Sequence, residues 1–259
     1  MTASQKLRIA AALCALACAA ASAQAQVISA WSFNNLAVGV NNAPAPSTGV
    51  GSAVPLGMTN NYTYATTPPV TGSINNADIQ GAAGINDWRV RGGSPGNGWN
   101  QAAPQYSQGA QFSVSTVGLG NIVFSYDWQS TNQGVRNLQA QYTIDGSGWT
   151  NVGPLQVAAT GEIYRTGLTI DFGALGITAV DNNASFAMRL VSAFDPTFGT
   201  PGTYTRTTQT AGLLAINNSS GNWRFDNISV SAVPEPHSVA LLLAGLVMVG
   251  AAARRRQRG

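Results

Sequence analysis

Short runs in which apolar and polar residues alternate recur through the middle of the chain. In the clearest run, residues 121–128, the side chains of Ile122, Phe124, Tyr126 and Trp128 fall on one side and the intervening residues fall on the other. A period of two residues is the signature of a β-strand with one buried face. No stretch of the middle region keeps the longer period of an amphipathic helix, so the pattern predicts strands.

Further runs of similar size predict strands at residues 27–33, 110–116, 138–144, 167–172, 185–192, 213–216 and 223–230. Turn residues separate them, and Asp145-Gly146 indicates a hairpin after residues 138–144. Proline- and glycine-rich segments between residues 36 and 109 predict long loops with a few short strands. Together these features predict an all-β fold, an antiparallel β-sandwich over residues 26–232.

The first 25 residues have the three parts of a secretory signal peptide. A basic start with Lys6 and Arg8 precedes an apolar run over residues 9–21, and small residues follow at Ala21-Ser22-Ala23. Export signals show these parts in this order and are removed after translocation. The alternative, a buried helix, fits less well because no polar face interrupts the run. We therefore expect an exported protein whose mature body begins near Gln26.

The formal net charge of +3 comes from the two ends of the chain. Residues 26–233 contain seven arginines, nine acidic residues and no lysine, which gives this body a net charge of about −2. A nucleic-acid-binding surface needs a concentration of positive charge that the body lacks. We therefore expect no nucleic-acid partner.

The body also lacks the side chains that most hydrolases use. Both cysteines, Cys14 and Cys18, lie in the signal peptide, and the one histidine, His237, lies in the tail. Ser-His-Asp and Cys-His centres and zinc sites built from imidazole or thiolate are therefore excluded. Paired carboxylates remain, as in glycosidases. Because the acidic residues are scattered without a recognisable catalytic spacing, we expect a protein that is not an enzyme.

The chain ends with an apolar segment and a basic cluster. Residues 239–253 carry no charge, and Arg254, Arg255, Arg256 and Arg258 follow. As a helix, this segment would be about 22 Å long, somewhat short for a hydrocarbon core of about 30 Å. The arginines prefer the cytoplasmic side and act as a membrane stop. The segment therefore predicts a transmembrane helix that holds the body on the outer side.

A rigid tripeptide, Pro234-Glu235-Pro236, stands before this segment. Its prolines fix two φ angles and remove two N–H groups, which favours an extended peptide next to the membrane that joins neither a helix nor a central strand. The order of tripeptide, short helix and basic end over residues 233–259 resembles the PEP-CTERM sorting signal of Gram-negative bacteria. The resemblance implies recognition by exosortase, a membrane protease, and delivery to the cell surface or extracellular matrix. The alternative is a plain membrane anchor that is never processed.

The body resembles, more weakly, the secreted bacterial jelly-roll domains. The resemblance depends on Ala30-Trp31-Ser32-Phe33, the segment 86–94, the strand ending in Asp145-Gly146 and the closing segment 223–230. Such domains share their architecture with carbohydrate-binding modules and often hold a structural calcium ion near the terminal strands. This resemblance implies Asp226 as a calcium ligand. The alternative is an ion pair between Asp226 and Arg89 or Arg224.

Aromatic residues raise the question of a carbohydrate ligand. Trp88, Trp99 and Tyr106 fall in the loop-rich region, where a flat ring could stack on a sugar. The alternative is a packed cluster that covers the edge of the sandwich. The other tryptophans lie within or beside predicted strands and are expected in the core: Trp31, Trp128, Trp149 and Trp223.

These features predict a non-enzymatic protein of the cell surface or extracellular matrix, anchored in the membrane until its tail is processed. Its many Asn, Gln, Ser and Thr side chains offer hydrogen bonds to an exopolysaccharide. Two alternatives stay open. The first is a carboxylate-dependent glycosidase or lyase. The second is a purely structural matrix component without a ligand.

Overall fold

The computed structural model describes residues 25–234, apart from residues 35, 38, 60, 66–85, 93–97, 209–211, 218 and 219. Several predicted features lie outside the described residues. They are the signal peptide before Ala25, the sorting residues Glu235 and Pro236, the apolar segment 239–253 and the four terminal arginines. Within the described ranges, no helix is long and apolar enough to cross a membrane.

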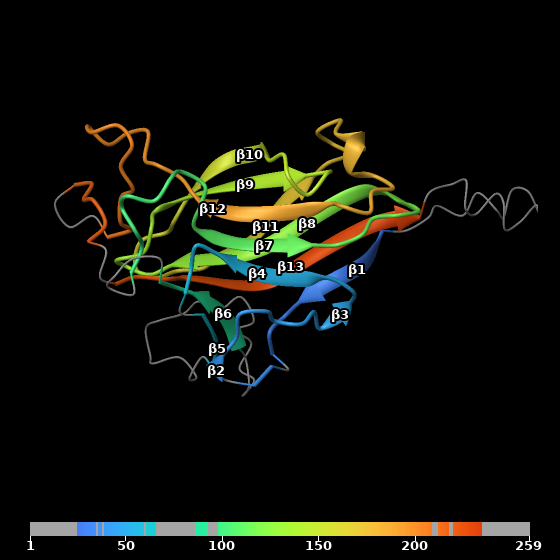
Figure 1. The fold of residues 1–259 in the computed structure, drawn as a ribbon, viewed down its shortest axis with the longest axis horizontal. Helices are drawn as coiled ribbons and strands as arrows, with labels where there is room; N and C mark the ends of the chain where they lie inside the picture. The colour runs from blue at the N-terminus through green and yellow to red at the C-terminus, as the bar shows by residue number, and fades with distance from the viewer. Residues whose placement is uncertain are drawn as a thin grey trace, which may run out of the picture.

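Two antiparallel sheets stack face to face (Figure 1). The eight-stranded sheet runs in the order β11 (Arg165–Asp171), β8 (Leu119–Ser130), β13 (Trp223–Pro234), β6 (Asn86–Val90), β5 (Tyr62–Ala65) and β2 (Gly39–Val40), and β1 (Gln26–Trp31) joins β13 to β3 (Thr48–Gly49). The five-stranded sheet runs β10 (Thr150–Val157), β9 (Asn137–Thr143), β12 (Ala187–Ser192), β7 (Gly109–Ser113) and β4 (Ser52–Leu56). One short 3-10 helix, η1 (Thr178–Val180), lies in the described part of the chain. The predicted antiparallel sandwich is confirmed.

Aromatic rings from both sheets interlock in the core. Phe112 of the five-stranded sheet has its ring centroid 5.3 Å from that of Trp31 and 6.0 Å from that of Trp88. The same ring lies 6.2 Å from Phe124 and 6.3 Å from Phe225. All five side chains are almost fully buried. Offset and edge-to-face pairs of this kind add to the stabilisation that burial itself gives.

A bulge in β13 makes the alternation of residues 223–230 differ from the simple pattern in the sequence. Simple alternation places Ile228 and Val230 on the face opposite to Trp223 and Phe225. In the structure, Asn227 has a positive φ of 47°, and the pairing of β13 with β8 shifts between Asp226 and Ser229. One extra residue reverses the facing of the rest of the strand. The four apolar side chains therefore all lie in the core.

Other boundaries differ in smaller ways. Residues 213–216 do not form a strand, because only Ala215 makes a bridge, to Thr205. The strands at 52–56 and 86–90 belong to the few short strands expected between residues 36 and 109. The strand at 150–157 was not among the predicted runs, since a glycine, a proline and polar residues interrupt its alternation. The predicted hairpin at Asp145-Gly146 is confirmed, because β9 and β10 pair on either side of it.

The last strand ends within the sorting tripeptide. Pro234 is opposite Leu119 in the β13–β8 pair, and Val233 is opposite Gly120. The predicted domain boundary at residue 232 therefore falls inside β13. We expected Pro234 to be excluded from a central strand, but at the final position the absent N–H removes only a terminal ladder bond. The folded body thus reaches directly to the tripeptide, without a linker.

Candidate functional site

The two loop tryptophans do not offer a ring to a ligand. Trp88 and Trp99 are both fully buried. The Nε1 of Trp88 donates to the carbonyl of Asn41 at 3.0 Å, and the ring of Trp99 lies 4.6 Å from that of Trp223. A sugar can stack only on an accessible face, so the assignment of these two residues to carbohydrate binding is wrong. Both residues are packed inside the sandwich, as the alternative of a packed aromatic cluster predicts.

Trp149 is the tryptophan that lies outside the core, where we had expected it to be buried. It is only half-buried and directly precedes β10. The guanidinium carbon of Arg189 lies 3.6 Å from the centroid of its ring. This is a close cation–π contact. The other three tryptophans expected in the core, Trp31, Trp128 and Trp223, are fully buried.

Arg189 belongs to a row of polar residues that crosses the outer face of the five-stranded sheet. In the register of the sheet, Arg189 is opposite both Gln111 of β7 and Gln141 of β9, and Gln141 is opposite Asn151 of β10. Alternation points these four side chains away from Met188, Leu190, Phe112 and Ala140, which are buried. We call Gln111, Arg189, Gln141 and Asn151 the polar row. It spans three strand spacings, or about 14 Å.

Hydrogen bonds fix the polar row at both ends. The Nε of Arg189 donates to Oε1 of Gln111 at 3.0 Å. The Nε2 of Gln141 donates to Oδ1 of Asn151 at 2.8 Å, and the Nδ2 of Asn151 donates to the hydroxyl of Tyr106 at 3.3 Å. Tyr106 is half-buried and is the one predicted sugar-binding residue that borders this face. The sequence held one signal for this site: Gln111, Gln141 and Arg189 are polar residues at outward positions of three predicted strands.

A groove lies beside the polar row on the same face. It has a volume of about 600 Å³, and its lining includes Gln111, Ser52, Ser113 and Ala187. Ser52, Ser113 and Ala187 follow one another across β4, β7 and β12. The side chains of these three residues are small. None of the described residues that line this groove carries a carboxylate.

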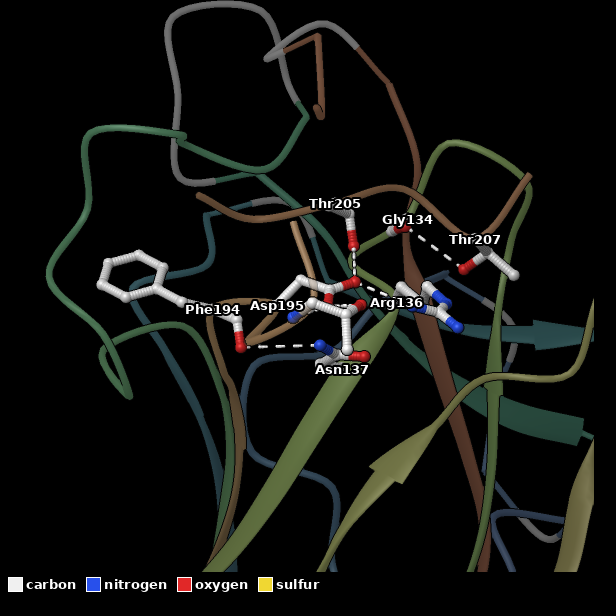
Figure 2. A network of polar contacts seen from close by, with 8 residues as sticks. Gly134, Arg136, Asn137, Phe194, Asp195, Thr205 and Thr207 are labelled. Atoms are coloured by element: carbon white, nitrogen blue, oxygen red, sulfur yellow. Dashed lines mark hydrogen bonds and ion pairs between the residues drawn. The ribbon is translucent and has the colours of Figure 1, made fainter. Parts of the chain in front are cut away.

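A second polar cluster holds the loops at the end of the sandwich near Tyr106. Figure 2 shows Asp195 between Arg136 and Thr205. Its Oδ2 accepts from Nη1 of Arg136 at 2.8 Å and from the hydroxyl of Thr205 at 2.7 Å, and its Oδ1 accepts from the Thr197 hydroxyl at 2.6 Å. Burial acts to raise the pKa of Asp195, but the hydrogen bonds from Thr197, Thr205 and Arg136 outweigh it and lower the pKa to about 2.

This cluster also positions Tyr106. Next to Thr205, the ring of Tyr204 packs against that of Phe194, with the centroids 4.5 Å apart, and its hydroxyl donates to the carbonyl of Pro104 at 2.7 Å. The backbone N–H of Tyr106 donates to the carbonyl of Ser192 at 2.9 Å. The loop that carries Tyr106 is therefore held to β12 and to the Asp195 cluster.

Replacing Asp195 with asparagine is expected to destabilise the body by about 2 kcal/mol at pH 7, because it breaks a buried ion pair and its hydrogen bonds. Since the pKa is lowered, the stabilisation is present above the ordinary value of 3.8 and is lost as the pH falls through about 2. Urea unfolding at several pH values measures this.

The matched control is Thr205→Val, which removes one hydrogen bond but keeps the charge. It should cost less at pH 7 and retain the acid dependence that Asp195→Asn loses. Equal pH profiles for the parent and Asp195→Asn would contradict this account of the cluster.

A third cluster lies on the outer face of the eight-stranded sheet. Asp87 is fully buried, and its Oδ2 accepts from the hydroxyl of Tyr164 at 2.9 Å and pairs with Nη1 of Arg224 at 3.0 Å. Burial raises the pKa of Asp87, and the charge of Arg224 only partly offsets this effect. Burial raises the pKa of Tyr164 as well. The segment that carries Tyr164 therefore covers this cluster rather than exposing it to a ligand.

Asp226 lies in the same layer. It is fully buried, and its Oδ1 accepts from the backbone N–H of Asn227 at 2.8 Å. Asp127 is its register partner on β8 and accepts from the Nδ2 of Asn227 at 3.0 Å. Within the described ranges, no group of three acidic, histidine or cysteine side chains is placed to hold a metal ion. Calcium at Asp226 stays a prediction.

Residues 232–256 match the PEP-CTERM protein-sorting motif. The chain carries a PEP-CTERM sorting signal. Such a signal indicates an exported protein that passes the membrane and is sorted by exosortase. The match begins at Ala232, inside β13, so the PEP-CTERM signal and the sandwich overlap at the last strand.

A comparison with curated proteins finds no match. Among solved structures, the chain is similar to the CBM22-1–GH10 modules of xylanase 10B from Clostridium thermocellum, complexed with xylohexaose. The identity is 11%, the match covers 66% of this chain and 24% of that one, and the TM-score is 0.31. The enzymatically active domain of tailspike protein 4 of bacteriophage CBA120 shares 10% identity over 71% of this chain and 19% of that one, with a TM-score of 0.31.

The K3 cleaved adhesin domain of Lys-gingipain from Porphyromonas gingivalis shares 12% identity over 65% of this chain and 85% of that one, with a TM-score of 0.27. The chain thus spans about a quarter and about a fifth of the length of the xylanase and the tailspike domain.

Proposed function

We propose that this chain is a non-enzymatic protein of the cell surface or extracellular matrix of a Gram-negative bacterium, and that its sandwich binds exopolysaccharide. Its tail is held in the inner membrane until an exosortase-like protease processes it. The binding site is the outer face of the five-stranded sheet, made of the polar row, Trp149, Tyr106 and the adjoining groove.

The observation that carries this proposal is the composition of that face. An aromatic ring, planar amides and a guanidinium lie together beside an open groove of about 600 Å³. Sugars present hydroxyl groups around an apolar ring face, and planar amide and guanidinium groups can engage the hydroxyls while an aromatic ring covers the apolar face. Sites for small ligands combine these two features in a concave surface.

The position of the acidic residues supports the proposal that the protein is not an enzyme. Asp127 and Asp226 are neighbours across β8 and β13, but both are buried on the other sheet. A glycosidase needs two carboxylates on either side of an accessible glycosidic bond. Incubation with exopolysaccharide should therefore release no new reducing ends, and their release would contradict this part.

Replacing Trp149 with alanine is expected to weaken exopolysaccharide binding by about tenfold, since an aromatic contact contributes about 0.5–1.5 kcal/mol beyond the area that it buries. The measurement is biolayer interferometry with polysaccharides of the producing bacterium on the sensor. The matched control is Val40→Ala, which shortens an exposed apolar side chain on β2 of the eight-stranded sheet, outside the proposed site. No binding by the parent, or equal binding by parent and Trp149→Ala, would contradict the proposed site.

A further inference from the structure

One charged residue dominates the candidate site. Among the five strands of the five-stranded sheet, Arg189 is the single residue with a charged side chain. It lies on the outer face, near its middle, between Gln111 and Gln141. The rest of that sheet offers neutral groups, so the electrostatics of the site depend on this one guanidinium.

The protein holds this guanidinium in place without neutralising it. Its Nε is bound to Gln111 at 3.0 Å, and its carbon lies 3.6 Å from the centroid of the Trp149 ring. The two ion pairs found in the described part of the chain join Arg136 to Asp195 and Arg224 to Asp87. Those pairs leave Arg189 without a carboxylate partner among the described residues.

The Nη donors of Arg189 are therefore available to a ligand. Arginine has five N–H donors in a planar fork, and the bond to Gln111 uses one of them. Stacking on a ring and a bond to Nε fix the plane of the fork in advance, so less conformational entropy is lost when a ligand binds. A planar fork of this kind matches the two oxygens of a carboxylate.

The acidic residue in the turn before Trp149 does not fill this role. Asp145 lies in the turn before Trp149, and its Oδ1 accepts from the backbone N–H groups of Ser147 at 2.8 Å and Gly148 at 2.7 Å. These hydrogen bonds lower the pKa of Asp145 to about 2 and hold its Oδ1 in the turn. The site thus presents an uncompensated cation on a body whose net charge is about −2.

We propose that Arg189 and Trp149 form a subsite for the carboxylate of a uronic acid residue, so that the sandwich prefers acidic exopolysaccharides. This inference rests on the proposed function and names its substrate class. The guanidinium binds the carboxylate through its Nη donors, and Gln111 and Asn151, the more exposed amides of the polar row, bind neighbouring hydroxyl groups. Because the body as a whole is acidic, the preference comes from this local cation and not from general attraction.

The test compares two polymers with the same linkages. The full chain, solubilised in detergent, is passed over sensors that carry polygalacturonate or carboxyl-reduced polygalacturonate, and the variants are Arg189→Gln and Arg189→Lys. Arg189→Gln keeps a donor for Gln111 but loses the charge. We expect the parent to prefer polygalacturonate by about tenfold or more, Arg189→Gln to lose that preference and Arg189→Lys to keep part of it.

The matched control is Arg165→Gln, which removes one positive charge from β11 of the other sheet and should leave the preference unchanged. Circular dichroism melting checks that each variant is folded. Equal binding of both polymers by the parent overturns the uronate inference and leaves the proposed function standing. Binding of neither polymer overturns the uronate inference, and the proposed function fails separately if the polysaccharides of the producing bacterium do not bind either.

Discussion

Replacing Trp223 with alanine is expected to lower the free energy of unfolding by about 3–5 kcal/mol, the cost of removing a large aromatic ring from a core. Trp223 is fully buried, and its ring lies 4.6 Å from that of Trp99 and 5.3 Å from that of Trp128. Its Nε1 donates to the carbonyl of Val135 at 2.7 Å. Urea unfolding of the body, followed by circular dichroism, measures the loss.

Two variants separate the causes of this effect. Trp223→Phe keeps a ring but loses the hydrogen bond, and the carbonyl of Val135 still accepts from the hydroxyl of Ser130 at 2.9 Å. It should therefore cost less than Trp223→Ala. Trp149→Ala removes a half-buried ring and should leave stability near that of the parent while polysaccharide binding weakens. Equal destabilisation by Trp149→Ala and Trp223→Ala would refute the assignment of these rings to surface and core.

Replacing Glu235 and Pro236 together with alanine is expected to abolish processing, so that the uncut chain stays in the membrane. Prolines keep the peptide extended, whereas alanines favour helix and would let the apolar segment extend toward the body. Pro234 is left in place because it pairs with Leu119 at the end of β13. Fractionation of cells and immunoblotting for the body measure the outcome.

The control for this variant is the replacement of two glutamines outside the signal, Gln105 and Gln133, with alanine. These changes should leave processing and delivery as in the parent. Recovery of a shortened Glu235→Ala, Pro236→Ala protein at the cell surface would contradict the role given to the tripeptide.

The sequence predicted the fold well wherever a strand alternates regularly. Residues 121–128 form the middle of β8, with Ile122, Phe124, Tyr126 and Trp128 buried as expected. The bulge at Asn227 could not be predicted, because its cause is the positive φ of a single residue in a continuous strand. Alternation fixes which side chains are buried only as long as no residue is inserted.

The candidate site was harder to predict because it depends on tertiary packing. Trp88 and Trp99 fall in a loop-rich stretch, yet other segments of the body bury them completely. Trp149 follows a turn and looked like the start of a core strand, but the hairpin points it onto the outer face beside Arg189. Which strands lie side by side, and hence which outward residues meet, is set by the order β10-β9-β12-β7-β4.

The structure adds a constraint on processing of the tail. β13 pairs with β8 along its length and also with β1 and β6, so it is a central strand of the eight-stranded sheet. Cleavage before Pro234 would cut into that strand. We therefore expect processing after Pro234, which leaves β13 intact.

The mass of the C-terminal peptide of the mature protein tests this account most directly. The protein is recovered from the cell surface, digested and analysed by mass spectrometry. The account predicts a last peptide that contains Pro234 and lacks residues 239–253. A surface protein that ends upstream of Pro234, or an uncut chain that is found in the cytosol and still carries both Lys6 and Arg258, would contradict it.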